Sequence, residues 1–171
     1  MKWARIVSDS AYHGGRMLNV GARAPEFELA DSEMEVVSLS AFRGKPVVLY
    51  FYPKDDTPGC TIEAIEFSEL AEQFEALGAV VLGVSMDDCL SHGSFRDKHG
   101  LSVELLSDPD GEVCRSYDVV QERDVDGQKR LSVVRSTYVI DREGIVRHAL
   151  YHVPPKGHAA EVLRLVKSLP R

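Results

Sequence analysis

The sequence predicts an α/β fold with a mixed central sheet flanked by helices, and three observations support this. Residues 47–52 and 79–85 are short runs of apolar, β-favouring residues, which is typical of buried strands. Between them, over 61–77, apolar residues recur at helical spacing. This strand–helix–strand order favours parallel pairing. Two later runs, 137–140 and 145–151, flank an Asp-Arg-Glu-Gly turn and predict an antiparallel hairpin.

The remaining elements are short, and turn or cap residues bound each of them. We expect short strands, a capped helical turn, a helix that ends at a glycine, a helical piece, a polar hairpin and a final helix. In chain order these are strands at 25–29 and 36–39, a turn at 41–43 capped by Ser40, a helix from Asp87 or Asp88 to His99 before Gly100, a strand at 103–106, a helical piece ending at Tyr117, a hairpin tip within 121–130, and a helix at 159–169.

Length and composition bound the class of protein. The chain has 171 residues, 44% hydrophobic and 27% charged, which suits one well-filled core, and we assign residues 17–171 to a single domain. Residues 1–16 show no clean periodicity, and we expect a disordered extension there. A net charge of −7 argues against nucleic acid or membrane partners. Three cysteines without a C-x-x-C pair, and no apolar signal core, favour the cytoplasm.

One cysteine occupies a position that favours an anion. Cys60 follows the apolar run 47–52 and a polar loop that Pro53 opens, and it lies where the next helix begins. The unpaired backbone N–H groups and the macrodipole of a helix N-terminus stabilise negative charge. The anion here would be a thiolate, the nucleophilic form of cysteine. The pattern therefore marks Cys60 as a candidate nucleophile, although many single cysteines are only small buried residues.

Two separated motifs resemble one family. Pro53, Thr57 and Cys60 form a P-x-x-x-T-x-x-C pattern within YPKDDTPGCTIEA, and Arg135 opens RSTYVIDREG far downstream. Both are similar to active-site segments of peroxiredoxins, and the longer string resembles the PrxQ branch, also called bacterioferritin comigratory protein. The resemblance runs from about Leu18 to the C-terminus. It implies a thioredoxin fold, here with an N-terminal extension.

The resemblance implies a thiol-dependent peroxidase that reduces hydrogen peroxide and organic hydroperoxides. Cys60 would be the nucleophile, while the Thr57 hydroxyl accepts from and donates to the peroxide, and the Arg135 guanidinium holds sulfur and peroxide oxygen. Pro53 would shield the thiolate, and the backbone amides of Gly59 and Cys60 would receive developing negative charge. No cofactor is implied. Thioredoxin or another external thiol would restore the enzyme, which we expect to be a monomer or weak homodimer.

Some alternatives stay open from the residues alone. Thr57 could serve as a helix cap, Arg135 as a solvated surface charge and Pro53 as a strand terminator. Glu63 either orients the arginine or is an acidic residue favoured in the first helical turn. A thiol–disulfide oxidoreductase is an alternative function, which the missing C-x-x-C disfavours. A redox-sensing or chaperone-like module is another.

The second thiol of the cycle is not obvious. PrxQ proteins place a resolving cysteine at positions that correspond to Ile65 and Arg96 here, so both routes are absent. Cys89 and Cys114 remain candidate resolving cysteines, but a buried structural role is favoured for each. We therefore expect a one-cysteine cycle. The histidines show no metal-ligand spacing, no metal is expected, and His92 and His99 are expected to be solvated or to cap a helix.

Overall fold

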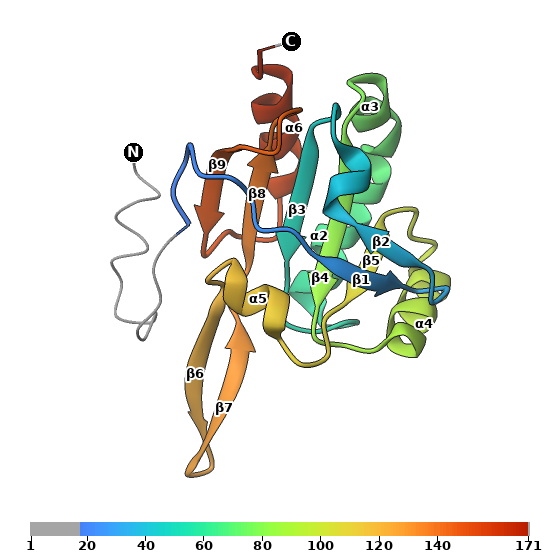
Figure 1. Ribbon diagram of the computed structural model, residues 1–171. Helices are drawn as coiled ribbons and strands as arrows, with labels where there is room; N and C mark the ends of the chain where they lie inside the picture. The colour runs from blue at the N-terminus through green and yellow to red at the C-terminus, as the bar shows by residue number, and fades with distance from the viewer. Residues whose placement is uncertain (1–17, 171) are drawn as a thin grey trace.

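A seven-stranded mixed sheet runs through the centre of the protein, in a computed structural model that describes residues 18–170 (Figure 1). The expected disorder of residues 1–16 lies outside the described residues. The strand order is β2-β1-β5-β4-β3-β8-β9. The sheet is formed by β1 (Glu28–Asp31), β2 (Val36–Ser38), β3 (Val47–Phe51), β4 (Val80–Ser85), β5 (Glu104–Ser107), β8 (Ser136–Ile140) and β9 (Val146–Tyr151). Because β3, β4 and β5 are parallel and their outer neighbours antiparallel, the predicted mixed sheet is confirmed.

The helices divide between the two faces of this sheet. They are η1 (Leu39–Phe42), α2 (Pro58–Glu69), α3 (Ala71–Ala76), α4 (Cys89–His99), α5 (Glu112–Ser116) and α6 (His158–Lys167). Buried side chains of α2, α3, α4 and α6 share one core, whereas α5 contributes to a second core on the other face. Figure 1 shows α5 on the opposite side of the sheet from α2.

Successive side chains of strand β3 belong alternately to the two cores. Val47, Leu49 and Phe51 belong to the core beneath α5, while Val48 and Tyr50 belong to the core beneath α2. Successive side chains of a strand point to opposite faces, so a strand buried on both sides is apolar throughout. This is why the uninterrupted apolar run in the sequence marks the central strand.

The predicted single helix over 61–77 is wrong. The structure has two helices there, because the backbone of Leu70 leaves the helical region with ψ near 7° and α3 starts afresh from its carbonyl. The first helix also begins earlier, at Pro58, where proline needs no hydrogen-bond partner. The single helical turn expected at 41–43 is present as the 3-10 helix η1. It begins two residues earlier, so Ser38 rather than Ser40 precedes it. No glycine or proline marks the break at Leu70, so the sequence offers no signal for it.

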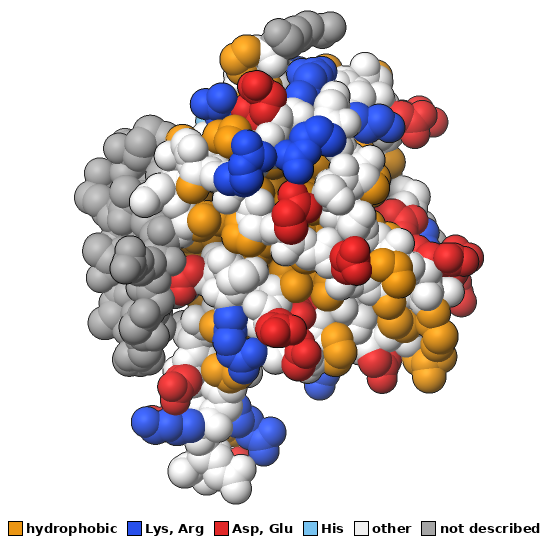
Figure 2. All heavy atoms as spheres, in the orientation of Figure 1, with side chains coloured by type: hydrophobic (Ala, Val, Ile, Leu, Met, Phe, Trp, Pro, Cys, Tyr) orange, Lys and Arg blue, Asp and Glu red, His pale blue; other side chains and the backbone are white. Residues whose placement is uncertain are grey.

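Two local predictions hold at α4 and at a projecting hairpin. Asp88 caps α4 by accepting a hydrogen bond from the Ser91 amide, and Gly100 ends the helix with φ of 62°. The polar segment forms the hairpin β6 (Val120–Val125) and β7 (Gln128–Val133), which stands clear of the body with charged side chains on it (Figures 1 and 2). Within residues 18–170, no helix is long and apolar enough to cross a membrane.

Candidate active site

Cys60 lies in the first turn of α2, directly after the loop that leaves the central strand. Thr57 precedes the helix in an extended conformation, and its carbonyl accepts the first backbone bond, from the Thr61 amide. The amides of Gly59 and Cys60 therefore lack carbonyl acceptors within their own helix. Cys60 packs in the core beneath α2 and is only 2% exposed. Access to its sulfur is thus limited to small molecules unless the loop moves.

Arg135 bridges the sulfur of Cys60 and the carboxylate of Glu63. It follows β7 and precedes β8, and its Nη2 donates to Cys60 Sγ at 3.4 Å. Its Nη1 donates to Glu63 Oε1 at 2.8 Å. Both acceptors lie on α2 one turn apart, so the planar guanidinium spans them with separate nitrogens. The structure thus brings Arg135 to Cys60 from 75 residues away in the sequence.

Burial sets the protonation of this bridge. Glu63 is fully buried, its Oε2 has no hydrogen-bond partner, and burial raises its pKa to about 7 against the opposing effect of Arg135. Burial alone lowers the pKa of Arg135, but the charges of Glu63 and Cys60 outweigh it and raise the pKa above its ordinary value. The guanidinium, with 16% of its side chain exposed, therefore stays charged. Burial, in contrast, shifts Glu63 toward its neutral form.

The other residues of the motif lie in the loop before the helix and at its start. The hydroxyl of Thr57 donates to the Lys54 carbonyl at 2.8 Å and caps no helical amide. The hydroxyl hydrogen of Thr57 is therefore used in this bond, and its oxygen can still accept a hydrogen bond. Pro53 is exposed at the rim of the loop. A Cβ on Gly59 would lie 3.0 Å from Arg135 Nη2, so glycine gives the guanidinium room to approach.

Cys114 lies on the wrong face of the sheet to meet Cys60. The three cysteines are free thiols. Cys114 belongs to the core beneath α5, whereas Cys60 belongs to the core beneath α2, and the sheet separates them. Burial, with Asp108 beside it, raises the pKa of the Cys114 thiol far above its ordinary value. Its backbone amide donates to the same aspartate at 2.8 Å, which is a structural contact.

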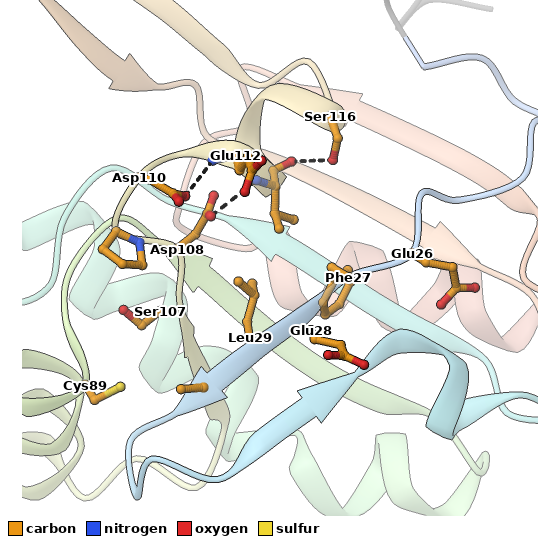
Figure 3. Close-up of a pocket in the computed structure, with 13 residues that line it drawn as sticks. Glu26, Phe27, Glu28, Leu29, Cys89, Ser107, Asp108, Asp110, Glu112 and Ser116 are labelled. Carbon is orange, nitrogen blue, oxygen red and sulfur yellow. Dashed lines mark hydrogen bonds between the residues drawn. The ribbon is translucent and has the colours of Figure 1, made fainter.

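Cys89 borders a groove rather than the site around Cys60. It is the first residue of α4 and is partly exposed. The groove, about 590 Å³ in volume, runs between Cys89, strand β1 and the segment leading into α5 (Figure 3). Its lining is acidic, with exposed side chains such as Glu28, Asp110 and Glu112. Nothing in this geometry places Cys89 against the sulfur of Cys60.

The sequence patterns did not reveal the buried polar groups around the site. The expectation that His92 is solvated or a cap is wrong, because it is completely buried and lies 2.7 Å from Asp55. His158 is also buried, 2.7 Å from the Thr137 hydroxyl, and burial followed by the charge of Arg135 lowers its pKa to about 4. A histidine in a polar stretch carries no periodic signal that distinguishes a buried ring from an exposed one.

Comparison with known proteins gives the family. The AhpC/TSA family model matches residues 20–149. A putative peroxiredoxin Bcp of Coxiella burnetii is 44% identical over 146 residues, covering 85% of this chain and 97% of the relative. Peroxiredoxin Bcp of Bacillus subtilis is 41% identical over 152 residues, covering 89% and 97%.

Solved structures agree with these relatives. The bacterioferritin comigratory protein of Xanthomonas campestris superposes with a TM-score of 0.79 at 40% identity, covering 83% of this chain and 90% of that one. A PrxQ variant of Xylella fastidiosa gives 0.84 at 37% identity, covering 90% and 98%. The expected thioredoxin fold is thereby confirmed. This chain belongs to the AhpC/TSA family and, within it, to the peroxiredoxins of the Bcp/PrxQ type.

Proposed function

We propose that the peroxidase reaction of this peroxiredoxin takes place at Cys60, with Arg135 and Thr57 activating and orienting the hydroperoxide. The observation that carries this assignment is the 3.4 Å contact between Arg135 Nη2 and Cys60 Sγ at a helix N-terminus. A free thiol has a pKa of about 8.5, so a cysteine peroxidase must favour the thiolate. A guanidinium and a helix N-terminus both do so, from different directions.

The first step forms a sulfur–oxygen bond and breaks the peroxide bond. The Cys60 thiolate attacks the terminal oxygen of ROOH, which gives the sulfenic acid and releases RO⁻. The alkoxide takes up a proton and leaves as ROH, or as water when the substrate is hydrogen peroxide. Thr57 accepts from the peroxide hydroxyl, because its own hydrogen is donated to Lys54. Arg135 and the amides of Gly59 and Cys60 receive the negative charge that develops on the oxygens.

The second step needs an external thiol. A reductant thiol attacks the sulfenic acid, forms a mixed disulfide and releases water, and a second thiol then frees Cys60 and leaves as the reductant disulfide. We assign this role to thioredoxin or another cellular thiol. The separation of Cys114 from Cys60 by the sheet and the position of Cys89 beside the groove support a one-cysteine cycle. Pro53 would limit the access of water to the thiolate.

The relatives and the composition support the proposed substrate class and setting. The Xanthomonas structure is described in terms of alkyl peroxide reduction, which supports organic hydroperoxides as substrates beside hydrogen peroxide. The net charge of −7 supports a protein without nucleic acid or membrane partners. Free thiols support a reducing compartment, the cytoplasm, where the chain would act as a monomer or weak homodimer.

Peptide mapping after one equivalent of peroxide tests the assignment. A sulfenic-acid trap should label Cys60 and leave the other two thiols unmodified, and Cys60→Ser should consume peroxide no faster than free cysteine. Label on Cys89 or Cys114 in most molecules, or a disulfide between either and Cys60, would overturn the proposed cycle.

A further inference from the structure

A buried aspartate–histidine pair ties the loop before Cys60 to helix α4. Asp55 Oδ2 lies 2.7 Å from His92 Nδ1, and the two side chains are 4% and 0% exposed. The same carboxylate accepts from the Tyr52 hydroxyl at 2.6 Å and from the Ser91 hydroxyl at 2.7 Å. Such a concentration of buried polar groups is costly unless every group is satisfied. Here every oxygen of the carboxylate has a donor.

The hydrogen bonds of the imidazole show that the pair keeps a shared proton. His92 Nε2 lies 2.9 Å from the Leu106 carbonyl, which can only accept, so Nε2 carries a hydrogen. A second hydrogen must then lie between Nδ1 and the Asp55 carboxylate, on one atom or the other. Both side chains are buried, so water cannot replace either partner when the other residue is substituted.

The backbone of the same loop needs external support. Asp56 has φ of 59°, a left-handed conformation that is uncommon outside glycine and that aspartate tolerates better than most residues. The amide of Asp55 donates to Asp87 Oδ2 at 2.7 Å, which attaches the loop to the end of β4 as well. Thr57 lies two residues beyond Asp55, and its hydroxyl turns back to Lys54. The side-chain pair and the backbone bond therefore fix both the acceptor oxygen and the start of α2.

We propose that Asp55 and His92 are positioning residues of the peroxidase, which hold the Thr57 loop in its reactive geometry and keep bulky disulfide reagents away from the reduced Cys60 thiol. Breaking the pair should have two opposite effects. Peroxide reduction slows, because the acceptor and the amides leave their places around the sulfur. Attack by a bulky disulfide reagent becomes faster, because the 2% exposed thiol is uncovered.

The chain supplies a matched control on the same two elements. Asp56, the next residue of the loop, pairs with His99 at 2.8 Å and with Lys98 at 2.7 Å, one to two turns further along α4. The Asp56 side chain is 42% exposed, so solvent screens this second pair. The two pairs share loop and helix and differ mainly in burial.

The experiment uses the full chain with Cys89→Ser and Cys114→Ser, so that only Cys60 reports. Asp55→Ala and His92→Phe should each lower the rate constant with hydrogen peroxide about tenfold or more, while the rate with dithionitrobenzoate, an aromatic disulfide, rises. The double variant should be no slower than the slower single one, because each change already breaks the pair. Asp55→Asn, which can donate to a neutral imidazole, should stay within about threefold of the parent.

The control and a milder variant keep the test decisive. His99→Phe, the counterpart of His92→Phe, and Asp56→Asn, the counterpart of Asp55→Asn, should each change both rates by less than about twofold. Ser91→Ala removes one donor to Asp55 without emptying the core, so it should show a smaller change in the same two directions even if the stronger variants fail to fold. The inference would be overturned by unchanged rates in Ser91→Ala and His92→Phe, or by a loss of peroxidase activity without faster attack on the disulfide reagent. An equal effect of substitutions in the exposed pair would also overturn it. The inference rests on Cys60 as the attacking sulfur, and a parent protein without peroxidase activity would instead refute that assignment.

Discussion

Replacing Glu63 with glutamine should change the way in which stability depends on pH. The Glu63 carboxyl is fully buried, and burial raises its pKa from 4.5 to about 7 despite the adjacent Arg135. A folded-state pKa above the unfolded-state value means that the folded protein binds this proton more tightly. The resulting stabilisation is complete below the unfolded value and is lost as the pH rises through the folded one.

The size of the effect follows from that rise in pKa. A change from 4.5 to about 7 corresponds to about 3 kcal/mol, at ~1.4 kcal/mol for each pH unit. Glutamine has nearly the same shape and stays neutral, so the variant does not lose this unfolding free energy as the pH rises. Between about pH 4.5 and about pH 8, the wild type should therefore lose about 3 kcal/mol of unfolding free energy relative to Glu63→Gln.

Urea unfolding of the two proteins at several pH values measures this difference directly. Asp118, whose pKa burial raises to about 6, and His158, whose pKa is lowered to about 4, titrate in both proteins and cancel in the comparison. Glu69→Gln, an exposed change in the same helix, is the control and should give a curve parallel to the wild type. Parallel curves for Glu63→Gln as well would show that the pKa of Glu63 is not raised in the folded protein.

Two further substitutions test the guanidinium contact. Arg135→Lys should reduce peroxide about a hundredfold more slowly, because lysine lacks the rigid planar fork of donors that contacts Cys60 and Glu63 together. Arg130→Lys on the exposed hairpin should have no effect in the same stopped-flow assay. Gly59→Ala should slow the reaction about tenfold, since its Cβ would lie 3.0 Å from the guanidinium. Gly93→Ala, whose Cβ would meet nothing closer than 3.9 Å, is its control, and equal rates for the two alanine variants would contradict this account.

The sequence was sufficient for the central strand, the parallel unit and the position of Cys60. Local patterns carry these features: an apolar run for β3, helical spacing after it and a proline-bounded loop between them. The contact between Arg135 and Cys60 is different. It depends on how β8 pairs with β3, and only the family resemblance pointed to Arg135 before the structure placed it.

The misses have physical causes that a single sequence does not display. The helix break at Leu70 has no local signal, because neither glycine nor proline lies near it in the sequence. His92 seemed a solvent-exposed residue because polar neighbours surround it in the sequence, yet its partner Asp55 lies in a different loop. The burial of Glu63, and with it the raised pKa, likewise depends on the elements that cover α2.

The role of Cys60 as the attacking sulfur is tested most directly by the rate of peroxide reduction in a protein that retains only this thiol. Cys89→Ser/Cys114→Ser keeps Cys60 with its contact to Arg135, and stopped-flow mixing with hydrogen peroxide in the presence of an external thiol follows its turnover. This variant should reduce peroxide with wild-type rate constants, and Cys60→Ser should be no faster than free cysteine. Loss of activity in the first variant, or its retention in the second, would contradict this role of Cys60.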